Sequence, residues 1–232
     1  MAGSFTYKKV KYNVLDEATV CVAKNEKYAG SLEIPETIEK NGSSFRVTAI
    51  ESGAFFNSGI TSVDIPGSIK ILSGSAFAGT PLEAVTLHEG TEVIESRVFK
   101  NCKLTTVLIP ESTKTIQQES FSGCEFLEDV AFVNPSGIAE VYFSSFEGTK
   151  WQSRLLDGSD SLILGDILVG VNTKDNAFRM PDGIKSLSPD AFSKCASLKE
   201  VIIPDGMTEL THGVFNQCGA LERIKLPSTF GR

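Results

Sequence analysis

Five cysteines are the residues of this sequence best suited to redox chemistry or metal binding. Cys102 with Cys124, and Cys195 with Cys218, are separated by 22 and 23 residues, so that a disulfide in either pair is conceivable and would leave Cys21 over. No pair has C-x-x-C spacing, which gives no support to structural zinc or thioredoxin-like chemistry. We favour free thiols facing the core, because equivalent positions of the sequence carry serine or threonine.

The two histidines could serve as metal ligands or as general bases. His88 and His212 lie far apart in the chain, and no H-E-x-x-H sequence is present. Exposed turn positions are the favoured interpretation of both residues. The sequence therefore predicts no metal site and no catalytic histidine.

Three short segments imitate known motifs without completing them. Gly74–Thr80 resembles a phosphate loop but lacks its lysine, and Asp157–Asp160 lacks most ligands of a calcium loop. Asn41–Ser43 is a formal glycosylation sequon that we interpret as a turn. No nucleophile elbow, carboxylate pair or cofactor fingerprint is found, so we predict no enzyme and no cofactor. A catalytic groove on a solenoid stays open as the less favoured alternative.

Phenylalanines reveal an internal repeat of about 22 residues, which must position any site. An aliphatic residue stands five positions before each phenylalanine, a small residue three positions after it, and then a Leu-x-x-Val-x-Leu/Ile segment that a proline often follows. The phenylalanines are Phe55, Phe77, Phe99, Phe121, Phe192 and Phe215, and the small residues are Ser58, Thr80, Cys102, Cys124, Cys195 and Cys218.

Each repeat predicts one coil of a solenoid. The Val-x-Ile alternation is typical of a strand with one buried face, and proline ends that strand. We expect a short helical turn between the aliphatic residue and the phenylalanine. One coil cannot bury its own apolar residues, whereas stacked coils form a continuous core. The predicted fold is a β-rich leucine-rich-repeat solenoid with one parallel sheet and short helical turns, of the right-handed β/α superhelix class.

The repeat is interrupted at the start of the chain and in the middle. Residues 1–45 predict a β cap, in which 7–14 and 18–22 form a hairpin. Residues 46–232 predict the solenoid, with a divergent section at 133–180 where 162–169 is one strand or two joined at Gly165–Asp166. No closing turn follows Pro227, which leaves open whether the chain is a fragment.

Composition excludes several classes of protein. The chain has 232 residues, 22 Lys and Arg, 29 Asp and Glu, and a net charge of −7. A hydrophobic content of 41% is typical of a globular chain and excludes disorder. The acidic balance disfavours nucleic acid, and no apolar run reaches the roughly 20 residues of a membrane-spanning helix.

The repeat resembles the BspA-like leucine-rich repeats of bacterial and protozoan surface proteins. It is clearest in residues 184–204, where Leu187, Phe192, Cys195, Leu198 and Val201 fall in the columns above. The opening, from Tyr12 to Ile50, resembles the amino-terminal cap of gut Bacteroidetes members. The resemblance implies a secreted or cell-surface protein without catalytic activity in the repeats. Members usually carry a secretion signal, and we expect that it has been removed from this chain.

Residues that flank the buried valine point away from the core and offer a replaceable, flat surface. We predict a protein-binding strip centred near Leu108; the simpler alternative is a solvated face of ordinary strand formers. Trp151 is a further candidate, either for stacking on a sugar or for packing on the divergent section. The predicted binding residues are Thr86, Thr106, Leu108, Asp129, Ala131, Glu200, Ile202 and Arg223.

The function predicted is a non-catalytic, adhesin-like interaction module at the cell surface or outside the cell. Its partner would be a protein, such as a host or matrix protein, with no nucleic acid and no membrane-spanning segment; its oligomeric state stays open. The alternative is a carbohydrate-binding or glycan-processing accessory module, and a spacer without a ligand also fits. Glycan sites usually need several planar aromatic side chains, and this sequence has one tryptophan.

Overall fold

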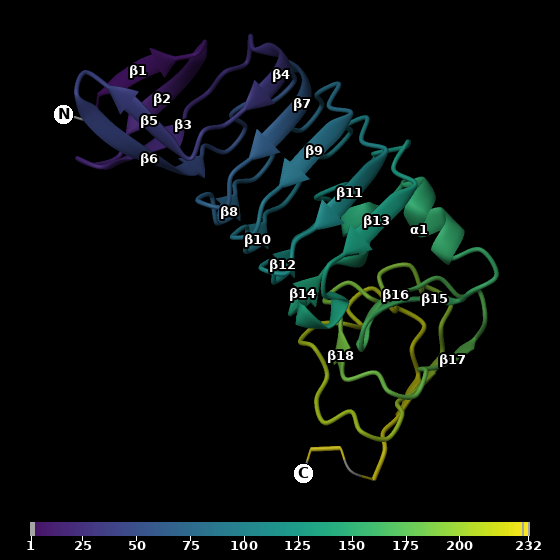
Figure 1. Cartoon of the computed structure of the whole chain (residues 1–232). Helices are drawn as coiled ribbons and strands as arrows, with labels where there is room; N and C mark the ends of the chain where they lie inside the picture. Colours follow the sequence, from purple (N-terminus) through teal and green to yellow (C-terminus); the bar gives the residue numbers. More distant parts are fainter. Residues whose placement is uncertain (1–2, 229, 232) are drawn as a thin grey trace. The chain divides into compact units, whose positions relative to one another are not determined.

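The computed structural model describes residues 3–228 and 230–231. The chain forms two compact units. The first unit comprises Met1–Glu140 and Ser144–Trp151, and the second comprises Val141–Phe143 and Gln152–Arg232. Both are built mainly from short strands (Figure 1).

A five-stranded sheet opens the first unit, with the strand order β1-β2-β3-β6-β5. Its strands are β1 (Ser4–Tyr7), β2 (Val10–Val14), β3 (Thr19–Val22), β5 (Thr37–Lys40) and β6 (Ser43–Ile50). The predicted hairpin is confirmed, because β2 and β3 pair antiparallel. The prediction of one strand over 7–14 is wrong, since Lys8 and Lys9 adopt positive φ angles and form a turn. Asn41–Gly42 is the turn of the β5–β6 hairpin, as predicted.

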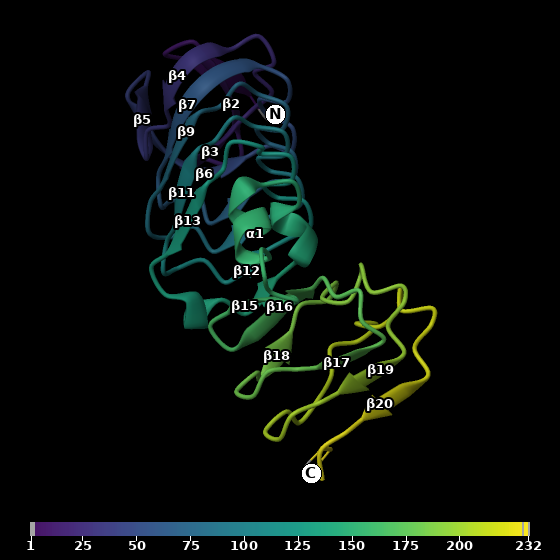
Figure 2. The ribbon, with the colours of Figure 1, turned by 90° about the vertical axis from the view of Figure 1, so that its right-hand side faces the viewer.

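Longer parallel strands form one wall of the first unit (Figures 1 and 2). β4 (Ala29–Glu33), β7 (Gly59–Ile65) and β9 (Ala84–Leu87) form one ladder, and β11 (Thr106–Ile109) pairs with β13 (Asp129–Phe132) in another. The sequence predicts a single sheet here, whereas the hydrogen-bonded ladders are two. They are joined just before β9 and β11, where the Lys103 N–H donates to the Leu82 carbonyl over 2.9 Å.

Phenylalanines stack along the inside of the first unit, which confirms the predicted column. The ring centroids of Phe55, Phe77, Phe99, Phe121 and Phe146 are 5.2–5.5 Å apart, at interplanar angles of 2–21°. All five side chains are fully buried. Offset stacking at this distance is a favoured arrangement of aromatic pairs, so that each coil fixes the position of the next.

Tight turns replace the helical turns predicted before the phenylalanines of the regular coils. The N–H groups of Phe55, Phe77 and Phe99 donate to carbonyls of the following coil rather than to their own segment. Ser75 and Arg97 adopt left-handed φ angles of 58° and 63°, which a right-handed helix cannot contain. Both features prevent a helix at this position.

Two-residue strands occupy the aliphatic column of these coils. β8 (Ile71–Leu72), β10 (Val93–Ile94) and β12 (Thr115–Ile116) pair in parallel, and Glu140 of β14 (Glu140–Val141) donates its N–H to Lys114. Along β8, β10 and β12, the aliphatic residue of each coil pairs with that of the next coil. The sequence pattern did not predict strands at this position. The first unit therefore has parallel ladders on two sides.

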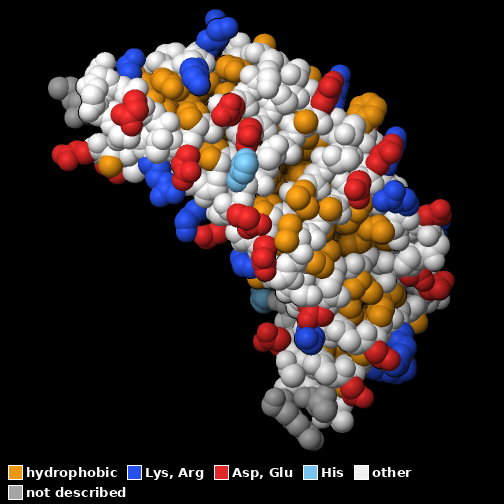
Figure 3. Space-filling view, viewed as in Figure 1, with side chains coloured by type: hydrophobic (Ala, Val, Ile, Leu, Met, Phe, Trp, Pro, Cys, Tyr) orange, Lys and Arg blue, Asp and Glu red, His pale blue; other side chains and the backbone are white. Residues whose placement is uncertain are grey.

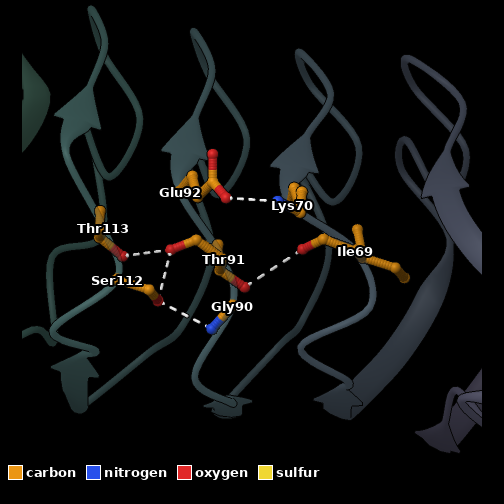
Figure 4. A network of polar contacts seen from close by, with 7 residues as sticks. All are labelled: Ile69, Lys70, Gly90, Thr91, Glu92, Ser112 and Thr113. Atoms are coloured by element: carbon orange, nitrogen blue, oxygen red, sulfur yellow. Dashed lines mark hydrogen bonds and ion pairs between the residues drawn. The ribbon is translucent and has the colours of Figure 1, made fainter.

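Polar side chains join the coils at the turns after the long strands (Figure 4). Thr113 and Ser112 both donate to the Thr91 carbonyl over 2.9 Å, and the Thr91 hydroxyl donates to Ile69 over 3.4 Å. Lys70 forms an ion pair with Glu92 at 2.7 Å. Since the partners are 21 or 22 residues apart, these bonds reinforce the 22-residue register.

The divergent section contains all the helices of the described residues. These are η1 (Pro135–Gly137), η2 (Phe143–Phe146) and α1 (Lys150–Leu155). Trp151 is 7% exposed, and its ring lies 4.7 Å from that of Phe146 between centroids. The hypothesis of an exposed, sugar-stacking Trp151 is therefore wrong, and the packing alternative holds.

The second unit contains one antiparallel hairpin and two further coils. β15 (Ser161–Leu164) and β16 (Ile167–Val171) pair antiparallel around Gly165–Asp166, so the two-strand alternative is confirmed. β16 pairs with β18 (Ser186–Leu187), and β17 (Ala177–Arg179), β19 (Glu200–Ile202) and β20 (Arg223–Lys225) form a parallel ladder. Phe192, Leu198, Val201 and Met207 lie in its buried core.

Candidate functional site

The cysteine column faces the core, as the sequence predicts, and all five thiols are free and buried. The Cys102 and Cys124 thiols donate to the phenylalanine carbonyls of the preceding coil over 3.2 and 3.0 Å. The Thr80 hydroxyl donates a hydrogen bond to the Phe77 carbonyl of its own coil. Burial raises the pKa of Cys102 and of Cys195 to about 11, and it also raises that of Cys124. Protonated thiols of this kind are poor nucleophiles.

The histidines lie at exposed turn positions, as predicted. His88 follows β9, and its Nε2 lies 2.7 Å from an Asp64 carboxylate oxygen. His212 is exposed in the second unit. Over residues 3–228 and 230–231, no cluster of three or more His, Cys, Asp or Glu side chains could hold a metal ion.

Two motif-like loops are structural. Phe77 in Gly74–Thr80 is a fully buried member of the phenylalanine stack, and the Gly74 N–H donates to the Glu95 carboxylate over 2.8 Å. Asp157–Asp160 forms part of the turn between α1 and β15. Among the described helices, none is long and apolar enough to span a membrane.

The outward residues of β4, β7, β9, β11 and β13 form a surface that we name the first strand face. Strand register aligns them within each ladder. The 22-residue spacing carries the columns on from β9 to β11, which gives two columns of five. The columns are Ser31, Ser62, Ala84, Thr106 and Asp129, and Glu33, Asp64, Thr86, Leu108 and Ala131. Five predicted residues lie here, all of them exposed: Thr86, Thr106, Leu108, Asp129 and Ala131.

Leu108 is the most prominent side chain of the first strand face. It is 56% exposed, and its register neighbour Ala131 is small. Val133, just beyond β13, is 51% exposed. Figure 3 looks onto this face and shows hydrophobic side chains gathered over the long strands. Because this neighbour is small, the Leu108 side chain projects from the face.

The charges of the first strand face are all acidic. Glu33, Asp64 and Asp129 are the charged members of the two columns, and Glu33 stands directly opposite Asp64 in the strand register. Like charges placed opposite each other repel. His88 contacts Asp64 from the end of β9, so that one of the three carboxylates has a partner.

A shallow hollow of about 680 Å³ borders this face at the ends of β4 and β7. Asp64, His88, Arg46 and Glu36 are among its lining residues. Arg46 and Glu36 already form an ion pair at 3.0 Å. The hollow is therefore polar and largely satisfied by its own side chains.

The second unit carries its own outward surface on β17, β19 and β20, which we name the second strand face. Its columns are Ala177, Glu200 and Arg223, and Arg179, Ile202 and Lys225. Glu200 accepts from Lys225 over 2.5 Å and from Arg223 over 3.2 Å. The hydrogen bond from Lys225 is the main cause that lowers the pKa of Glu200. Three basic residues against one acidic residue make this face cationic.

The eight predicted residues thus divide between the two faces: Glu200, Ile202 and Arg223 lie on the second. Ser31 and Glu33 on β4 also belong to the first strand face and were not predicted. The signal was present in Leu32, Ile34 and Pro35, which repeat the strand-and-proline pattern one coil before Ser62.

The repeat signature matches a known family of repeats. The BspA type leucine-rich repeat region matches residues 48–161 and 171–232 in six copies. The chain belongs to this family. These BspA-type repeats cover every coil whose phenylalanine, small-residue and strand columns are set out above.

Solved structures of bacterial proteins resemble this chain at low sequence identity. The pneumococcal vaccine antigen PcpA is 18% identical, with a TM-score of 0.52 over 99% of this chain and 71% of that one. A leucine-rich repeat protein of Bacteroides ovatus is 17% identical, with a TM-score of 0.50 over 97% and 77%. A leucine-rich cell surface protein of Faecalibacterium prausnitzii is 21% identical, with a TM-score of 0.48 over 99% and 78%. No curated protein matches the chain.

Proposed function

We propose that this chain is a non-catalytic, adhesin-like module of the cell surface or extracellular space, which binds a protein partner through the first strand face. The observation that carries the proposal is the exposed Leu108 on a flat surface of small side chains. A flat strand wall offers many replaceable positions without disturbing the core, which suits a binding scaffold.

Family membership supports an interaction module. Leucine-rich repeat proteins of this kind are typically non-enzymatic and generally bind proteins. The F. prausnitzii neighbour is called a cell surface protein and PcpA a vaccine antigen, which agrees with an extracellular location. In this proposal residues 1–45 cap the coils of 46–232 and expose the strands for binding.

The glycan alternative has less support. The two columns of the first strand face contain no aromatic residue, and Trp151 is buried against Phe146. Sugar recognition usually relies on exposed planar rings. The described phenylalanines of the stack are all committed to the core.

A capture experiment tests the proposal. The immobilised chain is screened against an array of purified extracellular and matrix proteins, and each captured protein is then tested on Leu108→Glu and Ala131→Glu. We expect capture to fall at least about tenfold, because a charge at an interface anchor must be desolvated. The thermal unfolding midpoint should stay unchanged, since both positions are exposed.

Ile71→Glu is the matched control, because Ile71 is 47% exposed on β8, outside the first strand face. It should leave capture intact. Equal capture by the wild type and by both face variants would overturn the proposed binding surface.

A further inference from the structure

The two strand faces carry opposite charges. Of the ten column positions on the first strand face, three are acidic and none is basic. Of the six on the second strand face, three are basic and one is acidic. The net charges of the column residues are therefore −3 and +2. Surfaces of opposite sign attract each other and are steered into contact.

Each face also has an apolar residue in its second column. Leu108 is 56% exposed on β11, and Ile202 is half-buried on β19. Asp129 lies one strand from Leu108, on β13. Around Ile202, Arg179 and Lys225 lie one strand away on either side in the same column. A long basic side chain therefore lies near Asp129 whichever way the two faces are turned, when Leu108 meets Ile202.

The acidic face has unmet charge, whereas the basic face is only partly neutralised. Glu33 and Asp64 stand opposite each other, and in the described structure the ion partner of Asp64 is His88. On the second face, Arg179 pairs with Asp182 at 3.5 Å, whereas Glu200 is shared between Arg223 and Lys225, so that these two cations divide one anion. When the faces meet, the basic residues of the second face lie near the carboxylates of the first face, which otherwise repel each other. The carboxylates of the first face in turn lie near the cations that Glu200 only partly neutralises.

From these observations we propose that the partner of the first strand face is the second strand face of another copy of this chain. The inference rests on the proposed function, since it uses the same surface, and it names the partner. Such a contact is heterologous, because different surfaces of the two copies meet. It can therefore continue from copy to copy.

The contact is weak by its size. Three to five strands spaced about 4.8 Å apart cover far less than the roughly 800 Å² per partner of a stable interface. Association is therefore expected to be transient in dilute solution and favoured where many copies are concentrated. Because exposed charges drive it, it should weaken steeply as salt rises from about 20 mM to about 300 mM.

Charge reversal of the full chain tests the proposal by sedimentation velocity. The acid-reversed variant is Asp64→Lys with Asp129→Lys, and the base-reversed variant is Arg179→Glu with Lys225→Glu. We expect the wild type to self-associate at about 0.5 mM protein in low salt, and each variant to associate at least about tenfold more weakly.

Mixing the two variants gives the decisive measurement. The reversed, basic first face of one variant then meets the reversed, acidic second face of the other, so that association should return in the mixture. A variant that fails to fold cannot restore it. Glu26→Lys with Glu125→Lys is the matched control for the acid-reversed variant, because it makes the same change in net charge at exposed turn residues outside both faces. It should associate like the wild type.

A wild type that stays monomeric in low salt would overturn this assignment, as would association that neither variant reduces or that mixing does not restore. The array experiment with Leu108→Glu distinguishes this failure from failure of the proposed function. If a foreign protein is still captured through Leu108, the binding face stands and only the partner assigned here is lost.

Discussion

The first unit stacks its phenylalanines nearly parallel, whereas the second unit tilts them. Phe121 and Phe146 lie at 2° even though 25 residues separate them, while Phe192 and Phe215 are 23 residues apart and lie at 50°. Phe178 meets Phe192 edge-on at 76°. Repeat length therefore does not decide ring geometry. Rings within the first stack have a ring on each side, whereas Phe215 is only partly buried.

The same contrast extends to the strand faces. The first face is acidic with an exposed Leu108, and the second is basic with Glu200 held by Arg223 and Lys225. The inward columns of both units are nevertheless alike. The core positions are constrained by packing, whereas the outward positions are free to differ, which is how one repeat can carry two surfaces.

Removal of a phenylalanine ring should give the largest difference in stability loss between the two units. Phe99→Ala should cost about 3–5 kcal/mol of unfolding free energy, because Phe99 is fully buried between two stacked rings. Phe215→Ala should cost only about 1–2 kcal/mol, because Phe215 is partly exposed. Urea denaturation measures both values. Equal losses would show that the tilted ring is as well packed as the stacked rings.

Glycines after the strands offer a second, smaller comparison. Gly90 has a φ of 119°, and a Cβ built there would lie 2.2 Å from the Gly67 carbonyl oxygen of the neighbouring coil. Gly206 occupies the same repeat position with a φ of 94°, and a Cβ there meets nothing within 4 Å. Gly90→Ala should therefore cost about 3–4 kcal/mol and Gly206→Ala about 1 kcal/mol.

Thermal or urea unfolding of the two glycine variants checks this difference. Both positions have a positive φ, and only Gly90 has a close neighbour, so that Gly206→Ala serves as the control for the effect of a positive φ. Losses of the same size in the two variants would contradict the close approach of the Gly67 and Gly90 turns.

Acid should produce the smallest effect, and it should act on both units. The hydrogen bond from Arg97, followed by that from Lys100, lowers the pKa of Glu119 below its ordinary 4.5, and Lys225 does the same for Glu200. A lowered folded-state pKa stabilises the fold above the unfolded value, and this contribution is lost as the pH falls through the folded value. Stability should therefore decrease below about pH 4.5.

Glu119→Gln and Glu200→Gln should each slightly reduce this loss of stability in acid. Unfolding midpoints measured between neutral pH and about pH 3 follow it. Glu125→Gln, at an exposed turn, is the control that should leave the loss unchanged. An equal loss of stability in acid in all three variants would show that these ion pairs do not cause it.

Much of the fold could be predicted because the residues that define the repeat are apolar side chains that must be buried. The phenylalanine column, the core-facing cysteines and the Val-x-Ile strands all follow from apolar periodicity. The tight turns could not be predicted, because they depend on the Phe77 N–H finding its acceptor in the following coil. The burial of Trp151 likewise depends on α1 and Phe146, which the repeat pattern does not relate.

The candidate site was predictable in part. Alternation alone places Thr106, Leu108, Asp129 and Ala131 outward, and the strand register agrees. Alternation says nothing of which coils share a unit, so that Glu200, Ile202 and Arg223 were grouped with residues of the other face. Charge pairing, such as that of Glu200 with Lys225, needs the spatial register of neighbouring coils.

By itself, the sequence determined the coil, its inward columns and the family, because burying a 22-residue unit leaves few choices of residue type at each core position. Only the tertiary structure decided which carboxylates stand side by side, which rings stack and where one unit ends. Those outcomes depend on contacts between coils that the period cannot encode, since every coil carries the same core pattern and a different surface.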